Sequence, residues 1–205
     1  MTATTPSRAP AVSVPPAPTA APRHPVGWWG VVGFMATEAT IFATLLAAYF
    51  FVRAGSPAWP QGGIEVPELK KISVATVVLL SSSIPLFVAE PAARKGNIRR
   101  VRAMLAVTFV MGAAFSVHQA MEYQELTFGI RDNAYASLFY VITGLHGIHV
   151  LVGLLMSLVV QAKAWTGRIT AERTLTLTVY SYYWHLVDVV WIFVFSSLYL
   201  SAHVR

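Results

Sequence analysis

The sequence predicts an all-α membrane protein, a bundle of five transmembrane helices with a cytoplasmic N-terminus and a C-terminus outside. Three observations lead to this prediction. Of the 205 residues, 56% are hydrophobic and only 12% are charged, whereas soluble domains carry about 25% charged residues. Five apolar runs are long enough to cross a bilayer as helices. Lysine and arginine gather in alternate connections between these runs, as they do in loops that stay in the cytoplasm.

The first 26 residues have a different composition from the rest of the chain. They contain seven of the twelve prolines, mixed with Ala, Thr and Ser. Such a segment cannot bury enough apolar surface to fold, so we expect a disordered cytoplasmic tail followed by one transmembrane domain at 27–205. Arg8 and Arg23 are scattered, and no short apolar core follows a basic start. The tail is therefore not expected to be a signal peptide.

The five predicted helices cover residues 28–52, 73–89, 103–121, 138–161 and 175–200. The second contains three consecutive serines, Ser81 to Ser83, followed by Pro85. A membrane helix tolerates such a proline when serine hydroxyls or neighbouring helices bond the freed carbonyls. The connection from Arg53 to Lys71 is rich in proline and glycine, which predicts an ordered turn without regular structure.

The charges of the connections predict the orientation. The connection after the third span is mainly acidic, whereas those after the second and fourth spans are basic and should face the cytoplasm. The basic residues are Arg94, Lys95, Arg99, Arg100 and Arg102, then Lys163, Arg168 and Arg173. The net charge of +6 is thus an orientation signal, and no nucleic-acid partner is expected. The chain has no cysteine, which excludes disulfides, thiolate metal sites and iron–sulfur clusters.

Glu38 lies inside the first predicted span, among apolar and small residues. Removal from water disfavours the ionised carboxylate, so we expect the protonated acid. Two interpretations remain open for this residue. It is either a neutral acid hydrogen-bonded to another helix or a carboxyl group that exchanges protons.

His185 and Asp188 lie in the middle of the fifth span, three residues apart and therefore on one helix face. An ionisable side chain at the bilayer centre costs about 2.5–3.5 kcal/mol on insertion scales. This face must therefore point into protein. The two residues form either a pair that locks the helix against its neighbours or a proton or ligand site.

Histidines in the third and fourth spans complete the set of candidate residues. His118 and Glu122 are one helical turn apart near the outer interface, which predicts an ion pair. His146 and His149 share a face beside Gly144, Gly147 and Gly153, which permit close helix approach. A zinc site needs three or four ligands, so we expect instead hydrogen bonds from His149 or His146 to the acids of the first and fifth spans. No catalytic motif is present.

Four motifs resemble subunit III of the haem–copper oxidases, in order and in approximate spacing. They are Ala-Thr-Glu-Ala-Thr-Ile-Phe around Glu38, His-Gln-Ala-Met-Glu-Tyr at 118–123, Gly-Leu-His-Gly-Ile-His-Val at 144–150 and Tyr-Trp-His-Leu-Val-Asp-Val-Val-Trp at 183–191. The resemblance covers residues 27 to 202. It implies that Glu38 is the family's intramembrane acid, which reacts with carbodiimide near the proton pathway of subunit I. His118, Glu122, His146, His149, His185 and Asp188 fall on recurrent polar positions of the family.

The resemblance also implies a function and partners. Subunit III is not itself catalytic and binds no haem, copper or other metal. It packs directly on subunit I, holds phospholipid in a cleft, supports proton uptake and protects the enzyme during turnover. Haem and copper belong to the partner subunits, which include subunit II and further small subunits or a respiratory supercomplex. The implied location is the bacterial plasma (inner) membrane, as a multi-pass protein in aerobic electron transport.

The chain departs from the family's longer members, because it matches their last five spans and lacks the first two. One wall of the lipid cleft must therefore come from a neighbour or be absent, and lipid contacts at Arg53, His146 and Arg173 are expectations only. A cytochrome c oxidase is the favoured complex. Subunit III of a quinol oxidase, an accessory subunit of nitric oxide reductase and a stand-alone proton-coupled transporter remain as alternatives.

Overall fold

The computed structural model describes residues 26–64 and 67–203, with side chains from residue 28 onward. The tail predicted for residues 1–26 lies almost wholly outside this range. The described residues are helical and contain no strand, and five stretches are long and apolar enough to cross a membrane. These stretches are Trp28–Ala54, Leu69–Arg94, Ile98–Glu125, Ala134–Trp165 and Leu175–His203. The predicted fold class is confirmed, whereas the orientation of the termini stays a prediction.

Three spans are single helices: α1 (Val26–Ala54), α4 (Ile98–Glu125) and α5 (Ala134–Trp165). Both α4 and α5 begin at an asparagine cap. Asn97 Oδ1 accepts a hydrogen bond from Arg100 N at 3.2 Å, and Asn133 Oδ1 accepts one from Ala136 N at 2.9 Å. Such caps satisfy N–H groups that have no partner inside the helix. They let these helices begin before the apolar runs do, so the spans are longer than predicted.

The second span is divided at Ser82 into α2 (Leu69–Ser81) and α3 (Ser83–Arg94). Pro85 has no N–H to donate to the carbonyl four residues earlier. Nearby hydroxyls supply other bonds: Ser82 Oγ donates to Leu79 O at 2.6 Å, and Thr108 Oγ1 of α4 donates to Ser82 O at 3.1 Å. The serine-rich break therefore has the hydroxyl partners that the sequence predicted.

The last span is also composite. The helix α6 (Leu175–Val194) continues into a π-helical segment, η2 (Phe195–Leu200), and a final short turn, α7 (Ser201–His203). The prediction for the connection at 53–71 is wrong in its details. Helix α1 continues to Ala54, α2 begins at Leu69, and a 3-10 turn, η1 (Gln61–Gly63), lies between them. Gly62 and Gly63 have φ of 72° and 69°, which glycine adopts without a steric penalty.

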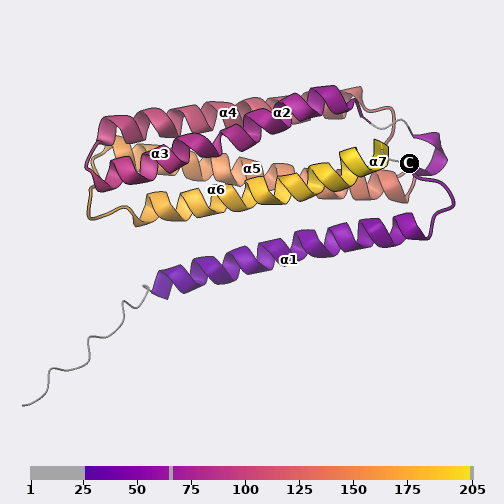
Figure 1. Ribbon diagram of the computed structural model, residues 1–205, viewed down its shortest axis with the longest axis horizontal. Coiled ribbons are helices and arrows are strands. Elements are labelled where there is room, and N and C mark those ends of the chain that lie inside the picture. The colour runs from indigo at the N-terminus through magenta and orange to yellow at the C-terminus, as the bar shows by residue number, and fades with distance from the viewer. Residues whose placement is uncertain (1–25, 65–66, 204–205) are drawn as a thin grey trace, which may run out of the picture.

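The helices form an elongated bundle in which α1 lies at one side (Figure 1). Helices α2, α3 and α4 occupy the opposite side, with α5 and α6 between, and α1 packs mainly on α5 and α6. Between Trp28 and Ala54, only Phe42 and Tyr49 are buried. The α3–α4 and α5–α6 connections lie at the same end as the start of α1 (Figure 1). The basic connections therefore share one end of the molecule.

The centre of the bundle is organised around Trp184 of α6, which is fully buried. Its indole lies in a slot between α4 and α5. A methyl group added at Gly112 would lie 2.5 Å from the ring, and one at Gly153 would lie 2.7 Å from it. The indole Nε1 donates to Ser82 Oγ at 2.8 Å. Gly153 thus permits close packing as the sequence predicted, whereas a methyl at Gly147 would meet nothing within 4 Å.

Candidate functional site

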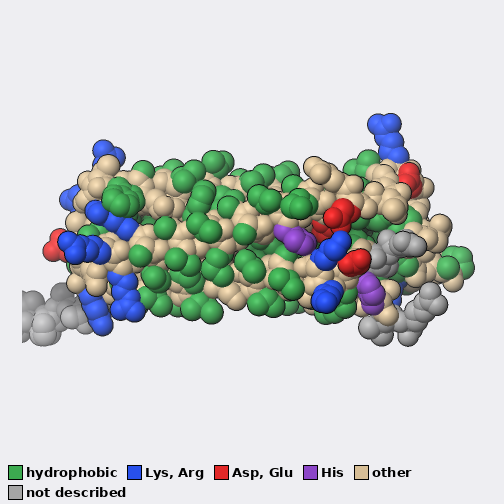
Figure 2. Space-filling model, turned by 90° about the horizontal axis from the view of Figure 1, so that it is seen from above, with side chains coloured by type: hydrophobic (Ala, Val, Ile, Leu, Met, Phe, Trp, Pro, Cys, Tyr) green, Lys and Arg blue, Asp and Glu red, His purple; other side chains and the backbone are tan. Residues whose placement is uncertain are grey.

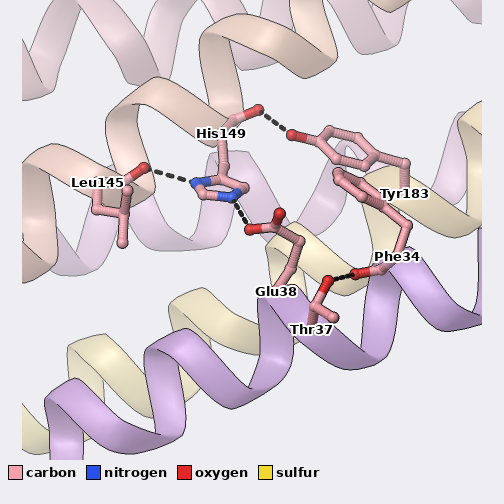
Figure 3. Close-up of polar contacts among 6 residues, drawn as sticks. All are labelled: Phe34, Thr37, Glu38, Leu145, His149 and Tyr183. Carbon is pink, nitrogen blue, oxygen red and sulfur yellow. Dashed lines mark hydrogen bonds and ion pairs between the residues drawn. The ribbon is translucent and has the colours of Figure 1, made fainter.

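Glu38 of α1 and His149 of α5 form an ion pair or hydrogen bond inside the membrane-spanning region (Figure 3). Glu38 Oε2 lies 2.6 Å from His149 Nε2, and the two side chains are 16% and 14% exposed. Tyr183 of α6 donates its hydroxyl to His149 O at 3.0 Å. The Phe42 ring packs edge-on against the imidazole, with centroids 5.1 Å apart. Three helices therefore meet at this pair.

The hydrogen bonds of His149 determine where its protons lie. Its Nδ1 is 2.8 Å from the carbonyl oxygen of Leu145, which can only accept, so Nδ1 carries a proton. The 2.6 Å contact at Nε2 then needs one more proton, held either by Glu38 or by the imidazole. Both arrangements have no net charge, which reduces the cost of placing them in a low-dielectric region. The proton can therefore move between the two groups with no change in the net charge of the pair.

A second cluster joins α3 and α6 through a serine hydroxyl. Ser83 Oγ donates to Asp188 Oδ2 and lies 2.8 Å from His185 Nδ1. Because the one hydroxyl proton is given to Asp188, the imidazole must donate at Nδ1. His185 also stacks on Phe87, with ring centroids 4.5 Å apart. His185 and Asp188 thus face protein, as predicted, but a serine of another helix links them.

Glu122 lies near the C-terminal end of α4, and its hydrogen-bond partners differ from the one predicted. Its Oε2 accepts hydrogen bonds from Gln119 Nε2 at 2.9 Å and from the Tyr199 hydroxyl at 3.1 Å. His118 does not pair with it, and His118 Nδ1 is buried without a hydrogen-bond partner among the described residues. The predicted His118–Glu122 ion pair is therefore wrong, because η2 brings Tyr199 to the carboxyl group.

His146 is 1% exposed and lies within a cage of aromatic rings. It stacks on Trp191 at 4.6 Å between centroids, with Phe42 and Phe115 edge-on to it. Neither ring nitrogen has a hydrogen-bond partner in the described part of the chain. The hydrogen bond predicted from His149 or His146 to an acid is therefore confirmed for His149, and His146 makes none among the described residues. The acid of the fifth span is bonded by Ser83 instead.

Comparison with known proteins identifies the family. The model of the family described as "Cytochrome c oxidase subunit III" matches residues 24–203. A cytochrome c oxidase subunit 3 from Thermostichus vulcanus is 37% identical over 172 residues, which are 83% of this chain and 85% of that protein. The chain belongs to the cytochrome c oxidase subunit III family. A cytochrome bo(3) ubiquinol oxidase subunit 3 from Pseudomonas aeruginosa is also 37% identical, over 185 residues, which are 87% of this chain and 88% of the relative.

Membership of the subunit III family has two direct consequences. The chain is a subunit III of a terminal oxidase and belongs to a multi-subunit oxidase complex. Its five apolar helices make it a multi-pass membrane protein. The resemblance to subunit III that the four motifs indicated is thereby confirmed.

The remaining predicted positions of this subunit III chain lie at its two ends. Arg53 donates from Nη1 to Ser201 Oγ at 2.6 Å and from Nη2 to Ser201 O at 2.9 Å, which ties the end of α1 to α7. Arg173 is exposed in the connection between α5 and α6. Lipid contacts at Arg53, His146 and Arg173 stay predictions. Among the described residues, no three His, Asp or Glu side chains gather as metal ligands.

Sequence reasoning missed two residues that organise the polar clusters of subunit III. Ser83 was interpreted only as part of a helix break, although three serines at mid-span are also a sign of hydrogen bonds between helices. Tyr199 lies near the end of the fifth span, where a tyrosine usually faces the membrane interface, but it is fully buried. No local pattern pointed from Tyr199 to Glu122, which is 77 residues earlier.

Proposed function

We propose that this chain is the non-catalytic subunit III of a bacterial cytochrome c oxidase in the plasma membrane. There it packs on the catalytic subunit I and supports proton uptake during oxygen reduction. Family membership supports the assignment to an oxidase. The chain itself binds no haem or copper, which the partner subunits carry, and phospholipid accompanies it in the complex.

The observation that carries the proton-linked part of this proposal is the contact between Glu38 and His149. The pair holds one exchangeable proton in a 2.6 Å hydrogen bond. It also lies where α1 meets the bundle, and α1 has little other burial. A group in this position can exchange a proton with a neighbouring subunit or with water at the surface of the chain. We assign that proton to Glu38 in the resting protein, because the sequence predicts the protonated acid.

Glu38→Gln tests this role in the complete oxidase. A tag on this chain is expected to recover haem-bearing partner chains from native membranes, seen in the visible spectrum and by mass analysis. In the variant, the complex should still assemble, because glutamine retains a hydrogen bond. Proton uptake should be slowed, because glutamine cannot release a proton, and oxygen uptake per haem should fall with it, since reduction of oxygen to water consumes protons. Infrared difference spectra should lose a protonated-carboxyl band.

The matched control is Thr37→Val, because Thr37 is exposed on the same helix and its hydroxyl bonds only Phe34 O among the described residues. It should leave proton uptake unchanged. Recovery of the chain without haem proteins would refute the subunit assignment. Normal proton uptake in Glu38→Gln would refute the proton-linked role alone, whereas an ionised carboxylate at pH 7 would place the shared proton on His149.

A quinol oxidase is the second candidate complex. The ubiquinol oxidase relative from Pseudomonas aeruginosa is as similar to this chain as the cytochrome c oxidase relative is. The donor site lies in other subunits, so the purified complex decides between the two. A copper-bearing subunit II and oxidation of reduced cytochrome c support the first candidate. Oxidation of quinol by a complex without that copper supports the second.

A further inference from the structure

A cavity of about 570 Å³ lies between α2 and α4, at the end of the bundle away from the basic connections. This volume is within the range of about 300–1,000 Å³ that is usual for small-molecule sites. The cavity is separate from the Glu38–His149 pair and from the predicted lipid contacts. Its polar lining includes Glu68, Lys71, His118, Glu122 and Glu125. The proposed function uses none of these residues.

The polar wall of the cavity is acidic. Three carboxyl groups face one lysine, so two negative charges remain when all are ionised. Lys71 Nζ bridges the helices at the rim, 2.9 Å from Glu125 Oε2 and 3.7 Å from Glu68 Oε2. Glu122 lies deeper and is 9% exposed. Both of its hydrogen bonds use Oε2, and no described residue bonds Oε1. Oε1 is not among the fully enclosed atoms that lack a partner, so it is accessible from the cavity and can accept a hydrogen bond from a cationic ligand.

The other wall of the cavity is apolar and continues along an exposed apolar flank of the two helices. Val74 and Met121 line it and are 63% and 57% exposed. Val77, Val110 and Val117 are exposed on the same two helices, nearer the middle of the spans. Figure 2, seen from the side of α2 and α4, shows acidic, basic and histidine side chains gathered near one end of a largely apolar face. The cavity therefore joins a charged pocket to a surface suited to acyl chains.

We propose that this cavity binds a phospholipid with a primary-ammonium headgroup, of the ethanolamine type, at the membrane–water interface. The ammonium group donates to Glu122, the phosphate contacts Lys71, and the acyl chains lie along Val74 and Met121. A quaternary ammonium cannot donate a hydrogen bond. It is usually held by Trp, Tyr or Phe rings, and none of the described residues that line the cavity is one of these. An anionic headgroup without an amine would be repelled by the excess of carboxylates in the cavity.

The test uses the whole oxidase complex, purified through a tag on this chain. The complex is placed in nanodiscs that contain equal amounts of phospholipids with ethanolamine, choline and glycerol headgroups. It is then washed with detergent, and the retained lipid is counted per haem by mass spectrometry. The ethanolamine lipid should be retained about tenfold over the others, because a hydrogen bond to a charged group contributes about 1.5–3 kcal/mol.

Two variants remove the headgroup contacts in different ways. Glu122→Gln keeps an acceptor for Tyr199, and Lys71→Gln changes a side chain that is 54% exposed, so its folding should be preserved. Each should lower the retained ethanolamine lipid about tenfold. Glu172→Gln removes an exposed acid at the opposite end of the molecule and should retain the lipid like the unchanged chain.

Several results would overturn the assignment. Equal retention of the three lipids would refute the proposed selectivity for the ethanolamine headgroup. Unchanged retention in Lys71→Gln and Glu122→Gln would refute the cavity as the binding site. A photoreactive residue at Val74 should link to lipid, and a link to another protein chain would instead make this face a subunit contact. Loss of haem partners would be a failure of the proposed function, whereas an intact complex without selective lipid is a failure of this inference alone.

Discussion

The hydroxyl of Ser83 has a larger role than its size suggests. It occupies the space between His185 and Asp188 and hydrogen-bonds both. Without it, two ionisable side chains of α6 would face α3 with no partner there. Leaving a buried polar group without its partner costs about 1–3 kcal/mol. The serine thus links α3 to α6 through polar bonds in a region where apolar contacts alone do not favour one helix pair over another.

Replacing Asp188 with alanine should weaken assembly of the chain with its partner subunits. Breaking a buried pair costs about 3–5 kcal/mol in soluble proteins, whereas hydrogen bonds in membranes average about 0.6 kcal/mol. We expect a loss between these values, measured as retention of the chain on native gels beside oxygen uptake per haem. Ser83→Ala should act in the same direction, and the double variant should lose less than the sum, because all three residues share one network.

Ser116→Ala is the matched control for these variants, because the Ser116 hydroxyl bonds only Gly112 O of its own helix. It should assemble normally. Oxidase that does assemble with Asp188→Ala should keep its oxygen uptake. Full assembly with oxygen uptake abolished would show that this cluster belongs to the chemistry rather than to the packing.

Individual residues differ in how far the sequence predicted their contacts. The bond from His149 to an acid of the first span could be expected, because an isolated carboxyl group at membrane depth needs a polar partner. The pair of His118 and Glu122 could not be judged from spacing. A separation of one turn brings two side chains close together, but Tyr199 competes for the carboxyl group from another helix.

At the scale of the elements, the packing of α4, α5 and α6 depends on the slot that holds Trp184. Gly153→Ala should destabilise the chain by about 1–3 kcal/mol, because the added methyl group meets a fully buried ring rather than the end of a flexible side chain. Gly112→Ala should act similarly from the α4 side. The measurement is the temperature at which the chain dissociates from the purified complex.

Gly147→Ala provides the comparison within the same helix, because its methyl group would meet nothing within 4 Å. It should leave the dissociation temperature unchanged or raise it slightly, since alanine favours the helix. Equal effects of Gly147→Ala and Gly153→Ala would show that helix propensity, and not the Trp184 slot, controls the result.

The helices themselves could be predicted because apolar length is a local property of the chain. Their ends could not, since the Asn97 and Asn133 caps extend α4 and α5 beyond the apolar runs. The π-helical segment η2 has no such signal in its residues. It lies where Tyr199 and Leu198 are fully buried, so contacts with other helices and not local preference select it.

At the scale of the whole molecule, the distribution of charge predicts the orientation in the membrane. Basic residues lie in and beside the connections at one end of the bundle, whereas Glu125 at the end of α4 and Asp132 in the α4–α5 connection lie at the other end (Figure 1). The chain has no cysteine, so one introduced thiol reports on one position. In intact cells, a membrane-impermeant thiol reagent should label Arg131→Cys and spare Lys95→Cys.

Both positions are exposed in the structure, and disrupted membranes should allow labelling of both variants. This control separates protection by the membrane from burial in a subunit contact. Labelling of Lys95→Cys alone in intact cells would reverse the predicted orientation.

The position of Glu38 on a helix with few buried residues affects how α1 is placed during assembly. Between Trp28 and Ala54, α1 buries only Phe42 and Tyr49, and two polar contacts hold it to other helices: Glu38 with His149, and Arg53 with Ser201. A slide of one helical turn, about 5.4 Å, would break both contacts and separate Glu38 from His149 at membrane depth. The two contacts together therefore set the position of α1 along the bundle. A neighbouring subunit that assembles later therefore meets α1 at a defined position along the bundle, with most of its side chains exposed and able to form contacts.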